Sequence, residues 1–114
     1  MAKVFAIHYF DLKPGANAAA FEKFIATDPF PTLSGWNAHI VKGERGERAG
    51  KYALIHEFDS VEIRNRYFPA EGGEPNPEVQ QLFNSPEMQA AGEQWDAFAT
   101  SMSQTVYTDY VVIG

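Results

Sequence analysis

The sequence predicts a single α+β domain in which helices cover one face of a four-stranded antiparallel sheet. Its 114 residues suit one domain and leave little room for a second core. Hydrophobic residues make up 45% of the chain, which is enough for a sizeable core. The hydrophobic patterns run in the order strand, helix, strand, strand, helical region, strand. That order favours one sheet with its helices on one side.

The first two predicted elements are a strand over residues 3–12 and a helix over residues 16–27. The strand is rich in β-branched and aromatic residues, and Pro14 ends it because proline has no N–H for the sheet. Pro29 and Pro31 end the helix, because each disfavours helical geometry in the residue before it. The helix carries an apolar stripe at a period of 3.6 residues: Ala18, Phe21, Phe24 and Ile25.

Two further strands are predicted over residues 36–42 and 51–59, joined by the polar, glycine-rich segment 43–50. The charges of this segment alternate in sign, which indicates a solvated hairpin loop. Because the segment is short and flanked by alternating strands, we expect a long antiparallel hairpin.

A hairpin loop over 44–49 would place His39 opposite Leu54 and Asn37 opposite His56. One face, expected to line a cavity or a subunit interface, then carries Asn37, His39, Val41, Tyr52, Leu54, His56 and Phe58. The other face, expected to pack under the helices, carries Trp36, Ala38, Ile40, Ala53, Ile55 and Glu57.

Three helix starts are predicted in the second half of the chain, at Ser60, at Asn76 and at Ser85. Each combines a capping side chain with a carboxylate in the first turn, and the last two add a proline. The third helix has the clearest apolar stripe: Met88, Ala91, Trp95, Phe98, Ala99 and Met102. A last strand over 105–113 closes the sheet.

These elements match a ferredoxin-like βαββαβ sandwich, with the strands in the spatial order 4-1-3-2 and all neighbours antiparallel. In such a sheet the helices cover one face and leave the other open. The open face carries bulky side chains with polar tips, which suits a subunit interface. We therefore expect the protein to be a homodimer that associates through this face.

Composition excludes several classes of function. A net charge of −6 argues against binding to nucleic acid or to an anionic membrane surface. The chain has no cysteine, which excludes disulfides, thiolate nucleophiles and cysteine-ligated zinc. No apolar run approaches membrane-spanning length, and residues 1–8 do not resemble a secretion signal. The expected location is the cytoplasm.

Several short segments resemble the dimeric α+β barrel superfamily. They are Lys13-Pro14-Gly15 before a helix with Phe21 and Phe24, then Glu57-Phe58-Asp59-Ser60, then Arg66-Tyr67-Phe68-Pro69, and finally the long amphipathic helix that leads into the closing strand. The superfamily includes stress-responsive barrel proteins, antibiotic-biosynthesis-type monooxygenases, muconolactone-isomerase-like proteins and NIPSNAP-like proteins.

This resemblance implies a homodimer whose two sheets pack face to face, with a small cavity between each sheet and its helices. Members of the superfamily are cofactor-free oxygenases, isomerases or haem-binding proteins, or have no known activity. The haem-degrading members use a histidine on a helix as the iron ligand. Here all three histidines fall in predicted strands, so no haem or other cofactor is expected.

Histidine is the side chain best suited to proton transfer near neutral pH. On a shared cavity face, His56 and His39 would act as general base and orienting partner, while Tyr52, Tyr9 and Asn37 would orient a substrate. Two histidines supply too few ligands for a metal, so no metal site is predicted. The alternative is that each of these residues is a hydrogen-bonded core or interface residue, which is the expectation for His8.

Arg64, Arg66 and Lys51 could bind a carboxylate, although a solvated surface explains them equally well. Two functions remain open at this point. The first is an oxygenase or isomerase without a cofactor, acting on a small apolar or aromatic metabolite. The second is a non-catalytic dimeric module that binds a small ligand or another protein.

Overall fold

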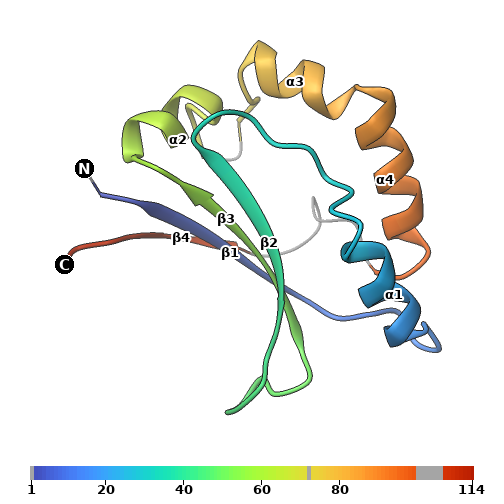
Figure 1. Cartoon of the computed structure of the whole chain (residues 1–114). Helices are drawn as coiled ribbons and strands as arrows, with labels where there is room; N and C mark the ends of the chain where they lie inside the picture. Colours follow the sequence, from blue (N-terminus) through green and yellow to red (C-terminus); the bar gives the residue numbers. More distant parts are fainter. Residues whose placement is uncertain (1, 72, 100–106) are drawn as a thin grey trace.

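The computed structural model of the chain describes residues 2–71, 73–99 and 107–114. Its elements follow the predicted order (Figure 1): β1 (Val4–Phe10), α1 (Ala18–Ile25), β2 (Trp36–Lys42), β3 (Tyr52–Phe58), α2 (Val61–Tyr67), α3 (Pro77–Phe83), α4 (Pro86–Asp96) and β4 (Tyr107–Val111). The predicted helix position Met102 and the predicted start of the last strand at Thr105 lie outside the described residues.

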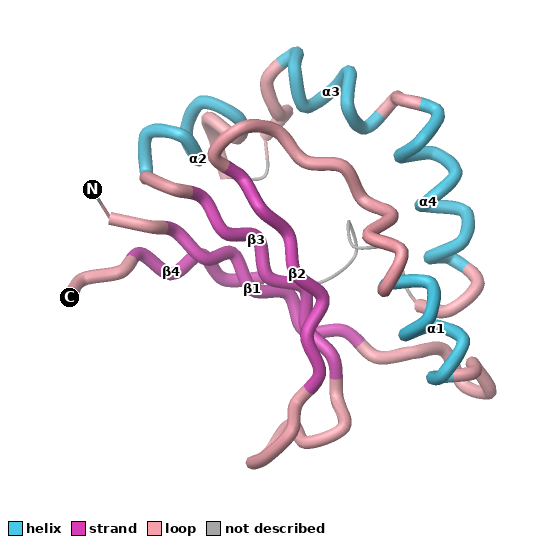
Figure 2. Tube along the Cα trace, viewed as in Figure 1, coloured by secondary structure: helices cyan, strands magenta, loops and turns pink. Residues whose placement is uncertain are grey.

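The strands form one antiparallel sheet in the order β2-β3-β1-β4, which confirms the predicted topology. The helices lie on one side of this sheet and leave the other side open (Figure 2). Both termini lie at the same end of the sheet, where the Val112 N–H donates to the Lys3 carbonyl at 3.0 Å. Within the described ranges, no helix is long and apolar enough to cross a membrane.

Side-chain caps begin each of the four helices in the described residues. Ser60, Asn76 and Ser85 each accept a hydrogen bond from the backbone N–H three residues later, as the start signals predict. Asn17 caps α1 in the same way, so this helix begins later than predicted.

The helix α4 ends at Asp96, before the stripe residues Phe98 and Ala99. The chain leaves the helix there because it pairs with the segment after β1. The Lys13 N–H donates to the Phe98 carbonyl at 2.7 Å, and Leu12 forms a bridge with Ala99. Phe98 and Ala99 therefore reach the core from the segment after α4 rather than from the helix itself.

The register predicted for the hairpin is wrong by one residue. His39 pairs with Ile55 and Ala38 pairs with His56, because the Gly43 N–H bonds to the Lys51 carbonyl and the loop runs from 44 to 50. Shifting one strand by one residue exchanges its two faces relative to its partner. Trp36, Ala38 and Ile40 face the helices as predicted, but in β3 the residues on that side are Tyr52, Leu54, His56 and Phe58.

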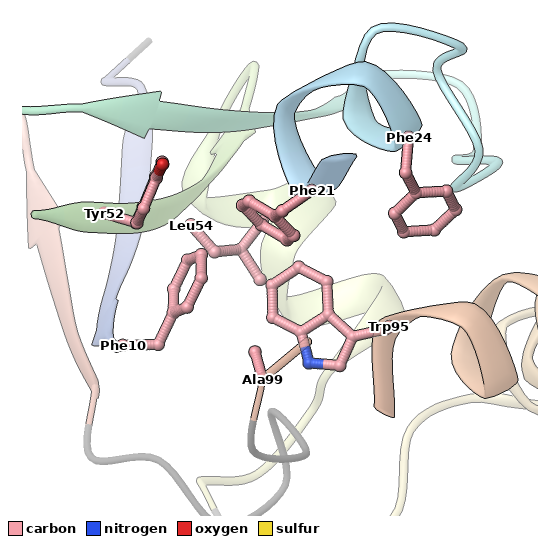
Figure 3. Packing of buried hydrophobic residues seen from close by; sticks show 7 residues of the cluster. All are labelled: Phe10, Phe21, Phe24, Tyr52, Leu54, Trp95 and Ala99. Atoms are coloured by element: carbon pink, nitrogen blue, oxygen red, sulfur yellow. The ribbon is translucent and has the colours of Figure 1, made fainter. Parts of the chain in front are cut away.

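The main hydrophobic core lies under α1 and α4, at the hairpin end of the sheet. Figure 3 shows its buried members: Phe10, Phe21, Phe24, Tyr52, Leu54, Trp95 and Ala99. Phe21 is fully buried, and its ring lies 5.2–6.0 Å from the rings of Phe10, Tyr52, Trp95 and Phe98. Trp95 is therefore a core residue, as the stripe predicts.

A second cluster lies at the other end of the covered face, under α2 and α3. Its buried members are Val4, Ala6, Trp36, Phe58, Tyr67 and Val79. Tyr67 ties α2 to the loop before β2, because its hydroxyl donates to the Ser34 carbonyl at 2.7 Å. A pocket opens beside this cluster, and Ala6, Trp36 and Phe58 belong to the walls of both.

Candidate functional site

The five residues predicted to form a site lie on two different faces of the sheet. His56 and Tyr52 face the helices, whereas His39, Asn37 and Tyr9 face the open side. His39 and His56 therefore do not share a cavity. The two-histidine arrangement is nevertheless present, because the topology places His8 of β1 beside His56, with ring centroids 5.5 Å apart.

A pocket of about 880 Å³ opens over the covered face beside these two histidines. In one cross-strand row, Ala6 stands between His56 of β3 and Asp109 of β4. A methyl group between two longer side chains leaves space above the sheet. Sheet, helices and loops together line the pocket: Ala6, His8, Trp36, His56, Phe58, Arg64, Asn65, Phe68, Pro69, Ala70, Glu71, Gly73, Phe83, Tyr107, Thr108 and Asp109. We call this the histidine pocket.

The hydrogen bond between Trp36 and His56 fixes the tautomer of His56. The indole Nε1–H of Trp36 donates to Nδ1 of His56 at 3.0 Å, and an indole can only donate. In the neutral ring the proton must therefore be on Nε2. No fully buried side-chain nitrogen or oxygen in the described part of the chain lacks a partner. Because no described residue accepts from Nε2–H, this group is accessible from the pocket that His56 lines.

Burial keeps both histidines neutral. It lowers the pKa of His56 to about 4, with a smaller contribution from the neighbouring His8. Burial also lowers the pKa of His8, although the carboxylate of Asp109 opposes this shift. The ring of His8 also stacks on Tyr107 with centroids 5.0 Å apart. The pocket thus holds two neutral imidazoles in different environments, one of them next to a carboxylate.

An ion pair joins α2 to β4 at the side of the pocket. Nη1 of Arg64 donates to Oδ2 of Asp109, and Nε of Arg64 donates to Oδ1 of Asn65 at 2.8 Å. Both partners of the ion pair are mostly buried, with 22% and 28% of their side chains exposed. Arg64 is therefore a pocket residue, whereas Arg66 and Lys51 pair with Glu78 and Asp11 on the surface.

The predicted residues on the open face have other contacts. Nε2 of His39 lies 3.4 Å from Oε1 of Glu57, whose other oxygen accepts from Lys3 at 2.6 Å. These two contacts lower the pKa of Glu57. Tyr9 is 55% exposed and stacks under the guanidinium of Arg48, 4.2 Å from its ring centroid.

A second hollow of about 510 Å³ lies at the edge of β2. Asn37 and His39 line it together with the loop 28–32 and Glu87. Unlike the histidine pocket, its lining holds only one phenylalanine, Phe30, and no tryptophan or tyrosine. Ligand sites combine apolar and aromatic walls with a few polar groups, so the histidine pocket is the better candidate.

The chemistry available in the histidine pocket is proton transfer and hydrogen bonding. A neutral imidazole can take a proton from a substrate, and a fixed N–H can stabilise the negative charge that this creates on an oxygen. Among the described residues, no three His, Asp or Glu side chains converge as a metal site requires.

Sequence reasoning missed His8 and Asp109 and left Arg64 undecided. His8 was expected in the core because Phe10, two residues along the same strand face, is a core residue. Only the pairing of β1 with β3 and β4 shows that His56 and Asp109 flank this part of the strand. A correct hairpin register would have placed His56 on the covered face and so pointed to His8.

Comparison with known proteins gives similarity at the level of the fold. No protein-family model matches the chain, and no curated protein matches it significantly. Among solved structures it is similar to SnoaB, a cofactor-independent oxygenase from Streptomyces nogalater, with a TM-score of 0.56 and 11% identity over 100% of this chain and 96% of that one.

Two other solved structures are similar over nearly the whole chain. One is a dabb family protein with a ferredoxin-like fold from Mesorhizobium loti, with a TM-score of 0.53 and 13% identity, covering 100% of both chains. The other is a dimeric protein with a ferredoxin-like fold from Bacteroides fragilis, with a TM-score of 0.51 and 17% identity over 95% of this chain and 94% of that one. The chain therefore has a ferredoxin-like fold, and the fold that the sequence resemblance implies is confirmed.

Proposed function

We propose that this protein is an enzyme that transfers protons on a small apolar or aromatic metabolite in the histidine pocket, without a bound cofactor. The observation that carries the proposal is the Trp36–His56 hydrogen bond beside His8. It gives one imidazole a fixed N–H and leaves the neighbouring imidazole neutral in an aromatic pocket. These are the two groups that removal of a proton next to a carbonyl requires.

The two histidines have different roles in this proposal. His8 takes the proton from carbon, because the carboxylate of Asp109 supports its charged form against the effect of burial. His56 donates its Nε2–H to the carbonyl oxygen and stabilises the enolate. His56 is a poor base because its Nδ1 already accepts from Trp36. This assignment differs from the sequence prediction, in which His56 is the base and His39 its partner.

Two reactions share this first step. In an isomerisation, His8 returns the proton to a different atom of the same molecule, so no other reactant is consumed. In an oxygenation, the enolate reacts with O₂. The similarity to SnoaB, a cofactor-independent oxygenase, supports the second reaction only through the shared fold.

The proposal can be tested by hydrogen exchange without knowing the natural substrate. In D₂O, 1-tetralone, an enolisable aromatic ketone, should exchange its α-hydrogens faster with the protein than in buffer, measured by ¹H NMR. Two substitutions separate the atoms of His56. His56→Asn keeps an acceptor near the Nδ1 position and loses the Nε2 donor, whereas His56→Gln keeps an N–H near the Nε2 position and loses the acceptor.

We expect His8→Gln and His56→Asn each to slow exchange by about 10²-fold, since positioned acid–base groups contribute roughly this much or more. His56→Gln should retain more activity than His56→Asn but be less stable, because it leaves the Trp36 indole without its acceptor. Exchange at the buffer rate with the wild-type protein, or at the wild-type rate in both slow variants, would contradict the proposal.

We further propose that the protein is a homodimer that associates through the open sheet face. This face carries a patch of apolar and aromatic residues, which we call the open-face patch: Phe5, Ile7, Tyr9, Val41, Ile55 and Tyr110. Tyr9, Val41 and Tyr110 are 55%, 38% and 53% exposed in the single chain, more than large apolar side chains usually are. The similar Bacteroides fragilis protein is dimeric, which supports the same assembly here.

Sedimentation velocity tests this assembly. The wild-type chain should sediment as a dimer. Ile7→Lys places a charge in the middle of the open-face patch and should yield a folded monomer, because an unpaired charge in an interface core is costly. Lys23→Ala, on α1 far from this face, is the control that should remain dimeric. A monomeric wild-type protein would rule the assembly out.

The second candidate function is a non-catalytic dimeric module. Burial of the proposed base favours it, because burial lowers the pKa of His8 and a weaker base removes a proton from carbon less readily. A module of this kind would bind aromatic ligands in the histidine pocket without accelerating exchange in any of them. Binding without exchange would therefore identify the module.

A further inference from the structure

We propose that the ligand of the histidine pocket carries a carboxylate, and that Arg64 binds this group in competition with Asp109. The inference rests on the proposed function, because it names the substrate class of the same pocket. It goes further in assigning a role to a residue outside the acid–base pair and in defining the charge of the ligand.

Arg64 is the cation of this pocket. Among the described residues that line it, Arg64 is the only lysine or arginine. Its neighbour on the same helix, Arg66, has 65% of its side chain exposed and pairs with Glu78. An arginine held mostly out of water is better placed than an exposed one to recognise a small anion, since its charge is less screened.

The guanidinium has donors to spare. Nε bonds to Asn65 and Nη1 to Asp109, while no described residue accepts from Nη2. Because no fully buried side-chain nitrogen in the described part of the chain lacks a partner, Nη2 remains accessible to solvent or to a ligand. A guanidinium binds a carboxylate through two parallel N–H groups. Nη1 and Nη2 together therefore suit such a ligand once Asp109 no longer accepts from Nη1.

The remaining polar groups also favour an acceptor over a cation. His56 presents an N–H, because its other nitrogen accepts from Trp36. Of the two lining carboxylates, Asp109 is already paired with Arg64, and Glu71 is exposed in a loop where water screens it. An ammonium group would find no unpaired buried carboxylate here and would lie near Arg64.

The walls define the rest of the ligand. Phe58, Phe68 and Phe83 line the pocket together with Trp36 and Tyr107. Aromatic surface of this kind binds a flat or apolar body. An aromatic or apolar acid, with its carboxylate at Arg64 and its body among these rings, satisfies both parts of the site.

Three probes of the same shape and different charge test the inference by isothermal titration calorimetry: 2-naphthoate, 2-naphthamide and 2-naphthylmethylamine. The wild-type protein should bind naphthoate at least about tenfold more tightly than the amide, and the amine most weakly, as expected for a partly buried charge-assisted pair. Arg64→Met should abolish this preference, and Arg64→Lys should retain part of it.

Asp109→Asn provides the sharper result. If Asp109 competes with the ligand for Arg64, this substitution should strengthen naphthoate binding several-fold and leave amide binding nearly unchanged. Arg66→Met, on the same helix but outside the pocket, is the matched control and should change neither affinity. Far-ultraviolet circular dichroism establishes that each variant is folded.

The other outcomes separate failure of this inference from failure of the proposed function. Equal affinity for acid and amide, or unchanged naphthoate binding in Arg64→Met, would overturn this inference and leave the proposed function standing. Weaker naphthoate binding in Asp109→Asn would show that Asp109 positions Arg64 rather than competing with the ligand. It would overturn the proposed competition between Asp109 and the ligand carboxylate. If no probe binds, the inference and the pocket function fail together. An acid preference without hydrogen exchange in 1-tetralone would support the inference and contradict only the enzyme.

Discussion

The two ends of the helix-covered sheet face differ in how completely side chains fill the space above the strands. At the hairpin end, Phe10, Tyr52 and Leu54 stand on the sheet and meet Phe21 and Trp95 from the helices (Figure 3). At the other end, Ala6 and the two histidines stand on the same strands, and an open pocket of about 880 Å³ remains. The same sheet and the same helix layer therefore enclose a filled core at one end and leave a pocket beside the second cluster at the other.

The two ends also differ in where their polar atoms lie and how they are paired. At the edge of the core, the Tyr52 hydroxyl donates to Glu22 at 2.6 Å. Burial of the phenol, together with this hydrogen bond, raises the pKa of Tyr52 to about 12. In the pocket, polar groups lie inside and are paired with each other, as in Trp36–His56 and Arg64–Asp109. Buried polar groups need such partners. The pocket end therefore contains paired polar side chains where the core end contains packed apolar ones.

The largest effect should come from removing a ring at the filled end. Phe21→Ala deletes a fully buried ring with four aromatic neighbours, and we expect a loss of about 3–5 kcal/mol in the free energy of unfolding. Phe83→Ala removes the same atoms from a pocket-lining residue that is 39% exposed. The free energy of unfolding should fall by about 1 kcal/mol or less. Urea unfolding of both variants measures the difference, and equal losses would show that the two ends are packed alike.

The second effect concerns pH at the pocket end. In the folded chain the His56 pKa is about 4, against an ordinary value of 6.5 that we assign to the unfolded chain. The unfolded chain therefore binds the proton first, and stability that is fully present above about pH 6.5 is lost as the pH falls toward 4. The shift corresponds to roughly 3 kcal/mol, since each unit is worth 1.36 kcal/mol.

Comparison with His56→Asn isolates this contribution. Urea unfolding at several pH values between 4 and 7.5 should give the variant a flatter dependence than the wild type. Carboxylates with a lowered pKa, such as Glu57, also lose stabilising contacts on acidification, but they are present in both proteins and cancel in the difference. Parallel curves would mean that His56 is not held neutral by burial.

Much of this fold could be predicted because local signals and topology agree. Alternation identified the strands, and capping residues such as Ser60 and Ser85 marked where helices begin. Element order then allowed only a few sheets, and the observed strand order is the one expected.

The site could not be predicted to the same degree, because it depends on register. Glycines at positive φ in the hairpin loop, Gly46 and Gly50, accommodate one more loop residue than expected, and that residue decides the face of His56. Asp109 and Arg64 are far apart in sequence and meet only in the folded chain. No local pattern in either segment indicates this contact.

The smallest expected change in stability comes from replacing one alanine by valine at each end of the sheet. Ala99→Val adds two methyl groups at a fully buried position in the core under α4, and overpacking should cost about 1–3 kcal/mol. Ala6→Val adds the same atoms on the floor of the histidine pocket, where there is space for them, so stability should change by less than about 1 kcal/mol. Ligand affinity should respond in the opposite way: the Ala6 variant should bind 2-naphthoate more weakly, while the Ala99 variant should retain its affinity. If Ala6→Val is as destabilising as Ala99→Val, the space beside His56 is part of the packed core, and the distinction between a filled and an open end does not hold.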